Sequence, residues 1–264
     1  MNTVVKSRQG PYKLLFRILK IAVITVLWLG IWQTASWLVG NEILLPSPLG
    51  TVIRIGELAV TDSFWQTIAM SLLRVTTGIV IAVILGILTA GLCFKSRFAY
   101  DAILPAITVI KATPVASFIF LILLWTGRDT ATVIITALIV FPIIWGNVIE
   151  GLKNIDVKLL EFAKCYRLPF TRRLRRITIP CVMPYFFSAV RTSLGLGWKA
   201  GIAAEALVMP SISIGKMLYF SKSNLETKDL FAWTVTVIIL SLLIELLFVS
   251  LLKKLGRKYN IDKK

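Results

Sequence analysis

The stretch from residue 181 to 208 is apolar except for a few side chains that recur at helical spacing: Arg191, Trp198, Lys199 and Glu205. At about 100° per residue, these four residues fall within an arc of roughly 120° on an α-helix. A charge inside an apolar segment is costly, so it usually pairs with another charge or lines a path for ions or polar solutes. The spacing therefore predicts one polar helix face that lines a pathway or the seam between two subunits.

The other charged residues in apolar stretches have simpler interpretations. Arg191 could also snorkel to the nearby interface, whereas Lys199 lies deeper and is the better pathway candidate. We expect Arg74 and Lys111 to pair with other groups or to snorkel. Glu245 is expected to reach water or a lysine.

Residue types that commonly carry out catalysis or bind metals are scarce. The chain contains no histidine, and its three cysteines all lie near the side predicted to be cytoplasmic, where thiols stay reduced. No GxxxxGK[ST] phosphate loop occurs, so the chain has no such site for binding and hydrolysing ATP. We therefore predict no catalytic residue, no metal site and no cofactor in this chain.

The elements that position these residues are long apolar segments. With 57% hydrophobic and 16% charged residues, the chain is too apolar for a soluble domain. The segments show no period-two alternation, which favours helices over barrel strands. The sequence predicts one all-α integral membrane domain over residues 1–264 with six transmembrane helices. The expected spans are roughly 20–39, 67–94, 101–125, 130–149, 181–208 and 230–252.

The distribution of basic residues predicts the orientation of these spans. Of the 30 lysines and arginines, 21 fall on the side of both termini and of the segment 150–179, five fall on the opposite side, and four lie within spans. This bias follows the positive-inside rule and predicts that both termini are cytoplasmic. The net charge of +17 is then explained by topology, and nucleic acid binding is not expected.

The segment "LLEFAKCYRLPFTRRLRRITIP", residues 159–180, combines an apolar stripe with five arginines. Asp156 can cap a short helix whose apolar residues recur at i, i+3, i+4 and i+7. These residues are Leu159, Phe162, Ala163 and Tyr166. Such a helix could lie in the lipid interface, with its arginines on anionic head groups, or pack into a groove on a partner protein.

This segment resembles the cytoplasmic signature loop of bacterial ABC importer permeases, in which Glu-Ala-Ala, three residues, Gly, nine residues, Ile, any residue, Leu and Pro follow one another. Glu161, Ala163, Ile177 and Pro180 match that pattern at the right spacing. It departs from the pattern at three positions, with Phe162 for the second Ala, Arg167 for the Gly and Ile179 for the Leu. Because the Gly is missing, Arg167 must make the turn that precedes Leu168 and Pro169.

Further stretches extend the resemblance over residues 44–252. They are "LPSPLGTV", "SLLRVTTGIVIAVILGILTAGL", "KATPVASFIFLILLWTG" and "GLGWKAGIAAEAL". Together they are similar to the subgroup that imports nitrate, sulfonates, taurine and some vitamin precursors. The resemblance implies a type I ABC importer permease (MetI-like) architecture in the bacterial cytoplasmic (inner) membrane. It also implies a gate or dimer contact for Trp198 and Glu205.

The resemblance further implies a division of work among chains. Residues 157–167 would form a coupling helix that inserts into a separate ATPase subunit, with Leu159, Phe162 and Tyr166 as its apolar contacts and with Glu161 and the arginines orienting it. The implied partners are two ABC ATPase subunits that carry ATP and Mg, a second permease copy that makes a homodimer, an extracytoplasmic solute-binding protein and the lipid bilayer. The chain itself would not be an enzyme.

Other interpretations stay open at this point. An ion-gradient-driven transporter or channel would need no ATPase, but no internal repeat and no ring of acidic residues in the spans is evident. A membrane scaffold could use the basic loop for lipid binding. Arg191 and Lys199 would favour an anionic cargo, although Glu205 partly cancels that field.

Overall fold

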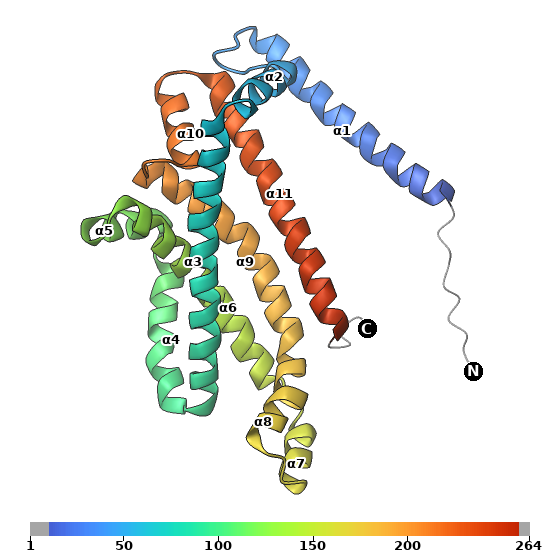
Figure 1. The fold of residues 1–264 in the computed structure, drawn as a ribbon, viewed down its shortest axis with the longest axis vertical. Helices are drawn as coiled ribbons and strands as arrows, with labels where there is room; N and C mark the ends of the chain where they lie inside the picture. Colours follow the sequence, from blue (N-terminus) through green and yellow to red (C-terminus); the bar gives the residue numbers. More distant parts are fainter. Residues whose placement is uncertain (1–10, 259–264) are drawn as a thin grey trace.

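The computed structural model describes residues 11–258, and every regular element in that range is helical. The long helices form a bundle, and short helices lie at both of its ends (Figure 1). The elements are α1 (Pro11–Val39), α2 (Pro48–Ala59), α3 (Asp62–Lys95), α4 (Arg97–Ala112), α5 (Val115–Trp125), α6 (Arg128–Lys153), α7 (Val157–Cys165), α8 (Phe170–Arg173), a π-helical turn (Leu174–Thr178), α9 (Ile179–Val208), α10 (Ile214–Ser223) and α11 (Thr227–Lys258).

Each of the six apolar windows coincides with helix, but not every helix meets the length and hydropathy expected of a span. Four do so alone: α1, α3, α6 and α11. The pair α4 and α5 qualifies together, as a fifth and strongly bent span. The 30-residue α9 carries three charged residues and is not among them, so the count of six spans stays a prediction.

The third apolar window, 101–125, is broken rather than merely kinked. α4 and α5 meet at 108°, and the break falls at Thr113 and Pro114. Proline has no N–H for the helical ladder, and it pushes the residue before it out of the helical region. Thr113 accordingly has φ −79° and ψ 130°, which is an extended conformation.

The core of the bundle is formed by α3, α6 and α9, which pack closely. A Cβ at Gly201 would lie 2.5 Å from a methyl carbon of Val75, and one at Gly197 would lie 2.8 Å from a methyl carbon of Val140. These two glycines of α9 therefore allow the backbone to approach α3 and α6, as a GxxxG spacing favours.

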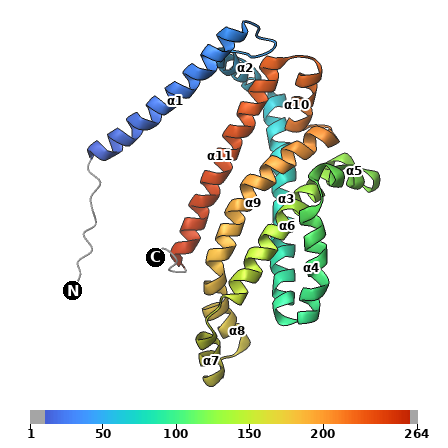
Figure 2. The ribbon, with the colours of Figure 1, turned by 180° about the vertical axis from the view of Figure 1, so that it is seen from behind.

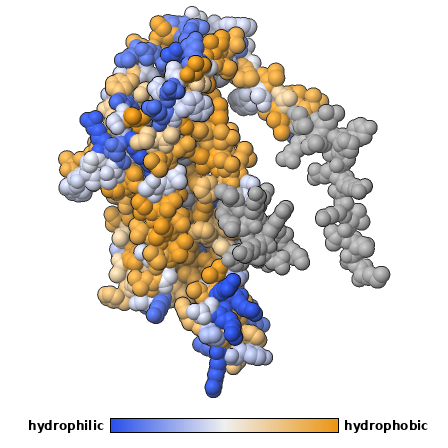
Figure 3. All heavy atoms as spheres, viewed as in Figure 1, coloured by the Kyte–Doolittle hydropathy of each residue, from blue (hydrophilic) through white to orange (hydrophobic). Residues whose placement is uncertain are grey.

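The remaining helices surround this core at different distances. α1 leaves the bundle at an angle in both views (Figures 1 and 2) and is anchored near its C-terminal end, where Trp32 donates to the carbonyl of Pro46. α7 and α8 project at one end, and α2 and α10 lie at the other. On the face drawn in Figure 3, an apolar band separates hydrophilic side chains at these two ends.

Candidate functional site

The short helix α7 presents apolar side chains to solvent at the end of the bundle. Its N-terminus is capped as expected, because the Asp156 carboxylate accepts a hydrogen bond from the N–H of Lys158 at 2.9 Å. Leu159, Phe162 and Tyr166 are 41%, 51% and 68% exposed. The rings of Phe162 and Tyr166 lie 4.4 Å apart and form one continuous apolar surface. We call Leu159, Phe162 and Tyr166 the α7 apolar face.

One residue of the expected stripe points the other way. Ala163 is only 3% exposed and belongs to the same buried cluster as Ile155 and Ile177. A side chain of this size lets α7 rest on the start of the α8–α9 segment, so Ala163 anchors the helix while the α7 apolar face stays outside. Glu161 is exposed, and Pro180 lies half-buried in the first turn of α9.

Arg167 makes the turn that the family pattern assigns to glycine. Its φ is 47°, in the left-handed region. The N–H of Leu168 donates to the carbonyl of Ala163, and the N–H of Arg167 donates to that of Lys164. These two bonds form a Schellman motif with Arg167 at the position where glycine is preferred. The turn keeps its geometry without glycine, at the cost of backbone strain.

The chain continues from that turn into one long helical rod. α8, the π-helical turn Leu174–Thr178 and α9 follow one another without a break. Arg172, Arg173, Arg175 and Arg176 lie in this rod, and the guanidinium of Arg173 lies over the ring of Phe170. After the turn at Arg167, a short and continuous helical connection thus joins α7 to α9.

The four candidates on α9 do not share one environment. Arg191 and Lys199 are exposed, whereas Trp198 is 1% and Glu205 is 0% exposed. The Trp198 indole N–H donates to the carbonyl of Val237 on α11 at 3.2 Å. Part of the expected 120° arc is therefore packed against neighbouring helices, and the rest is exposed. The arc does not form a single polar face in this chain.

Glu205 is held in a network that we call the Arg74–Glu205 cluster, formed by the buried residues Ser71, Arg74 and Glu205 and by the exposed Asp129. The Ser71 hydroxyl donates to one Glu205 oxygen at 2.7 Å, and the N–H of Gly215 donates to the same oxygen at 3.3 Å. Arg74 Nη1 lies 3.4 Å from the other Glu205 oxygen. Arg74 and Glu205 are therefore structural partners, as expected for Arg74.

Asp129 and the segment before α10 complete this cluster. Arg74 Nη2 lies 2.6 Å from an Asp129 oxygen without an aligned hydrogen bond, so Asp129 acts as a counter-charge. Arg74 Nη1 also donates to the carbonyl of Ile212 at 2.7 Å. The cluster connects α3, the start of α6, the end of α9 and the start of α10. The sequence pattern did not indicate roles for Ser71 and Asp129, although two opposite charges in separate spans, Arg74 and Glu205, were a signal for pairing.

Arg191 is paired with Glu245 on α11 at 3.2 Å. Glu245 is about half exposed and so reaches water as expected, and its cationic partner is an arginine of α9 rather than a lysine. Both side chains are about half exposed, so this pair contributes little to stability.

A second ionic group lies at the opposite end of the bundle. Arg54 on α2 bonds to Asp229 on α11 and to Glu57 on its own helix. The hydrogen bonds that Arg54 donates to Asp229 and then to Glu57 hold the pKa of Arg54 above its usual value. These contacts fasten α2 to the first turn of α11.

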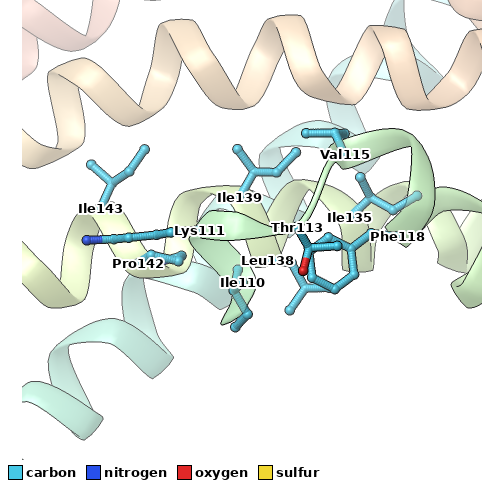
Figure 4. Close-up of a pocket in the computed structure, with 10 residues that line it drawn as sticks. All are labelled: Ile110, Lys111, Thr113, Val115, Phe118, Ile135, Leu138, Ile139, Pro142 and Ile143. Atoms are coloured by element: carbon cyan, nitrogen blue, oxygen red, sulfur yellow. The ribbon is translucent and has the colours of Figure 1, made fainter. Parts of the chain in front are cut away.

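A cavity of about 200 Å³ opens where α5 turns away from α4. It is lined by Ile110, Lys111, Thr113, Val115, Phe118, Ile135, Leu138, Ile139, Pro142 and Ile143 (Figure 4). Lys111 is its only charged lining residue, and among the described residues no carboxylate lies within 4.0 Å of it. Pro114 therefore does more than kink the span, because the break that it makes uncovers a face of α6.

A bundle of long apolar helices with ionic groups inside its spans is the architecture of a multi-pass membrane protein. The chain belongs to the family of binding-protein-dependent transport system inner membrane components, whose profile matches residues 78–261. It is therefore a multi-pass transmembrane permease subunit of an ABC importer, and transport rather than catalysis is its family's role.

Relatives over most of the chain carry several cargoes. The chain is 31% identical to the aliphatic sulfonates transport permease SsuC of Escherichia coli, over 87% of this chain and 88% of that protein. It is 24% identical to the taurine transport permease TauC of the same organism, over 86% and 83%. The nitrate import permease NrtB of Synechococcus elongatus is 28% identical over 69% and 68%.

Solved structures support the fold. An amino acid ABC transporter matches 77% of this chain and 97% of its own chain, with a TM-score of 0.61 and 17% identity. A bacterial ABC transporter involved in the import of the acidic polysaccharide alginate matches 90% and 96%, with a TM-score of 0.62 and 14% identity. The all-α architecture expected from the sequence is thus confirmed.

Proposed function

We propose that α7 is the coupling helix through which an ATPase subunit drives this permease. The observation that carries the proposal is the α7 apolar face, which protrudes beyond the spans while Ala163 anchors the helix from behind. An interfacial helix would lie in the membrane plane at the level where the spans end. α7 instead projects past the end of the bundle (Figure 2). A groove on a partner protein suits such a helix.

The energy available from this docking is moderate. Full burial of a large apolar side chain contributes about 1.5–3 kcal/mol, and roughly half of each side chain in the α7 apolar face is still exposed. The three residues would together supply roughly 2–5 kcal/mol before ordering costs. Glu161, Arg167 and the arginines of the α8–α9 rod would set the orientation at the rim.

In this proposal the chain forms a homodimer that binds two ATPase subunits, with ATP and Mg held by those subunits. An extracytoplasmic solute-binding protein delivers the cargo at the end that contains α2 and α10. Both termini and α7 are then cytoplasmic, in agreement with the bias of basic residues. The cargo is a small anion, as the names of the sulfonate and nitrate relatives indicate.

The pathway roles on α9 divide accordingly. Lys199 is exposed on α9 and is proposed to face the pathway or the second copy. Arg191 with Glu245 would act as a contact near the cytoplasmic end. Trp198 and Glu205 are proposed to act on a gate only indirectly, by fixing α9 against α11 and α3.

The test compares substitutions at Phe162 in proteoliposomes that contain the permease and its ATPase. Phe162→Asp should abolish co-purification of the ATPase and ATP-dependent uptake, because it places a charge in an apolar contact. Phe162→Leu keeps an apolar side chain and should retain most activity. Leu225→Asp, an exposed apolar residue at the opposite end, is the matched control and should keep the ATPase bound. Full uptake by Phe162→Asp would refute the docking role of α7.

A further inference from the structure

The cavity beside the break between α4 and α5 has the composition of a binding site for an amphipathic anion. Its walls are almost entirely aliphatic, with Phe118 at one end (Figure 4). The Thr113 hydroxyl is already used, since it donates to the carbonyl of Val109 at 2.8 Å. The one group left to contact a polar ligand through a side chain is the amine of Lys111.

Lys111 lies in the last turn of α4, within an apolar segment, and its side chain is exposed in the single chain. It follows Arg97 by fourteen residues, which is about 21 Å along α4 at 1.5 Å per residue. Its amine extends towards Pro142 and Ile143 of α6 (Figure 4). Pro142 is in turn about 21 Å along α6 from Arg128. Along each helix this amine is therefore far from the terminal arginine of that helix.

The other charges within the spans are mostly satisfied by the chain itself. Arg74 is paired with Glu205 and Asp129, and Arg191 with Glu245. Lys111 has no such partner among the described residues, although an isolated charge within an apolar segment is costly. A ligand that supplies a negative charge would offset that cost.

The size and shape of the cavity restrict the ligand further. At about 30 Å³ for each water molecule, 200 Å³ holds roughly six waters. That is enough for a small anionic head group with a short aliphatic body, and too little for a large polar solute. Ile135, Leu138 and Ile139 offer the body an apolar wall.

We propose that this cavity binds the transported solute as a short-chain organic anion, with the Lys111 amine against the anionic group and the aliphatic wall of α6 against the body. The proposal rests on the proposed function, because it names the substrate class of the same pathway. It adds a site that the α7 coupling step does not require. The broken span is then a binding element, with the bend exposing α6 to the solute.

Direct binding to the purified full-length chain in detergent tests this site without any ATPase. The probe is ethanesulfonate, titrated by ligand-observed NMR, and ethyl methyl sulfone is its neutral isostere. We expect ethanesulfonate to bind and the sulfone to bind at least tenfold more weakly. Lys111→Gln should lower ethanesulfonate affinity at least tenfold, Lys111→Arg should stay within about threefold, and Lys222→Gln, an exposed lysine on α10, should change nothing.

Additional variants make the result decisive. Ile139→Phe narrows the cavity and should weaken ethanesulfonate more than it weakens nitrate, measured as a competitor. Thermal melting without ligand establishes that each variant is folded. If folded Lys111→Gln bound ethanesulfonate as tightly as the native chain does, the proposal would be overturned. The proposal would also be overturned if the chain did not bind ethanesulfonate but bound phosphatidylglycerol, and if Lys111→Gln abolished that lipid binding. The ligand of the cavity would then be a lipid head group.

The two proposals can fail separately. Loss of coupling in Phe162→Asp leaves anion binding in detergent measurable. Conversely, failure of ethanesulfonate to bind leaves ATPase co-purification and its loss in Phe162→Asp unaffected.

Discussion

Removal of the Glu205 carboxylate tests whether the Arg74–Glu205 cluster is structural. Glu205 is fully buried and accepts bonds from Ser71, Gly215 and Arg74. Breaking a buried ion pair by removing one partner costs about 3–5 kcal/mol. Arg74 keeps Asp129 as a counter-charge, so the lower end, about 3 kcal/mol, is expected for Glu205→Ala.

A graded series separates charge from shape at this position. Glu205→Gln keeps an oxygen that can accept from Ser71 and Gly215 but loses the charge and the oxygen that accepts from Arg74, so it should cost about 1–2 kcal/mol. At about 2–4 °C for each kcal/mol in a chain of this size, Glu205→Ala should lower the melting temperature in detergent by roughly 6–12 °C. Glu226→Ala, at an exposed position, is the control and should stay within about 0.5 kcal/mol.

The pairing itself is measured by a double-mutant cycle. Arg74→Leu and Glu205→Leu should each be strongly destabilising, because each leaves the other charge buried. The double variant should be less destabilised than the sum of the two by at least about 1 kcal/mol. Strictly additive effects, or a Glu205→Ala protein that melts with the native chain, would refute a structural role for the cluster.

Three further predictions follow from single contacts. Arg167→Gly should stabilise α7 by about 0.5–1 kcal/mol, because φ 47° costs an L-residue about 1–2 kcal/mol, part of which is offset by the greater chain entropy that glycine loses on folding. Slower amide hydrogen exchange in α7 would show this stabilisation. The control Arg172→Gly, inside α8, should instead destabilise its helix. Ser193→Ala should be neutral or stabilising in a thermal melt, since the fully buried Ser193 hydroxyl has no partner among the described residues. Gly201→Val should lower the melting temperature sharply, because even a Cβ there would lie 2.5 Å from Val75.

Local patterns in the sequence predicted the elements that depend on local physics. The apolar windows became helices because the backbone polar groups of long apolar segments must be satisfied internally. Asp156 caps α7 because a carboxylate at that position meets free N–H groups at the helix start. The departure at Arg167 marked the strained turn, since the chain has to reverse there whatever the residue.

Tertiary packing decided what periodicity could not. Lys199 and Glu205 fall within one arc of α9, yet one is exposed and the other buried, because α3 and α10 cover only part of that arc. The partner of Glu245 was likewise set by how α11 crosses α9. A helical wheel gives the angle between two side chains on one helix. Which of those side chains are buried depends on where the neighbouring helices pack.

The charges within the spans point to a positive interior once their partners are known. Glu205 and Glu245 are each paired with an arginine. Lys111 and Lys199 are left without carboxylate partners among the described residues, on α4 and α9. A lysine at membrane depth has to face water, another chain or an anion. The two lysines therefore have the same requirement, and an anion that moves through a water-filled path between two copies would satisfy each in turn.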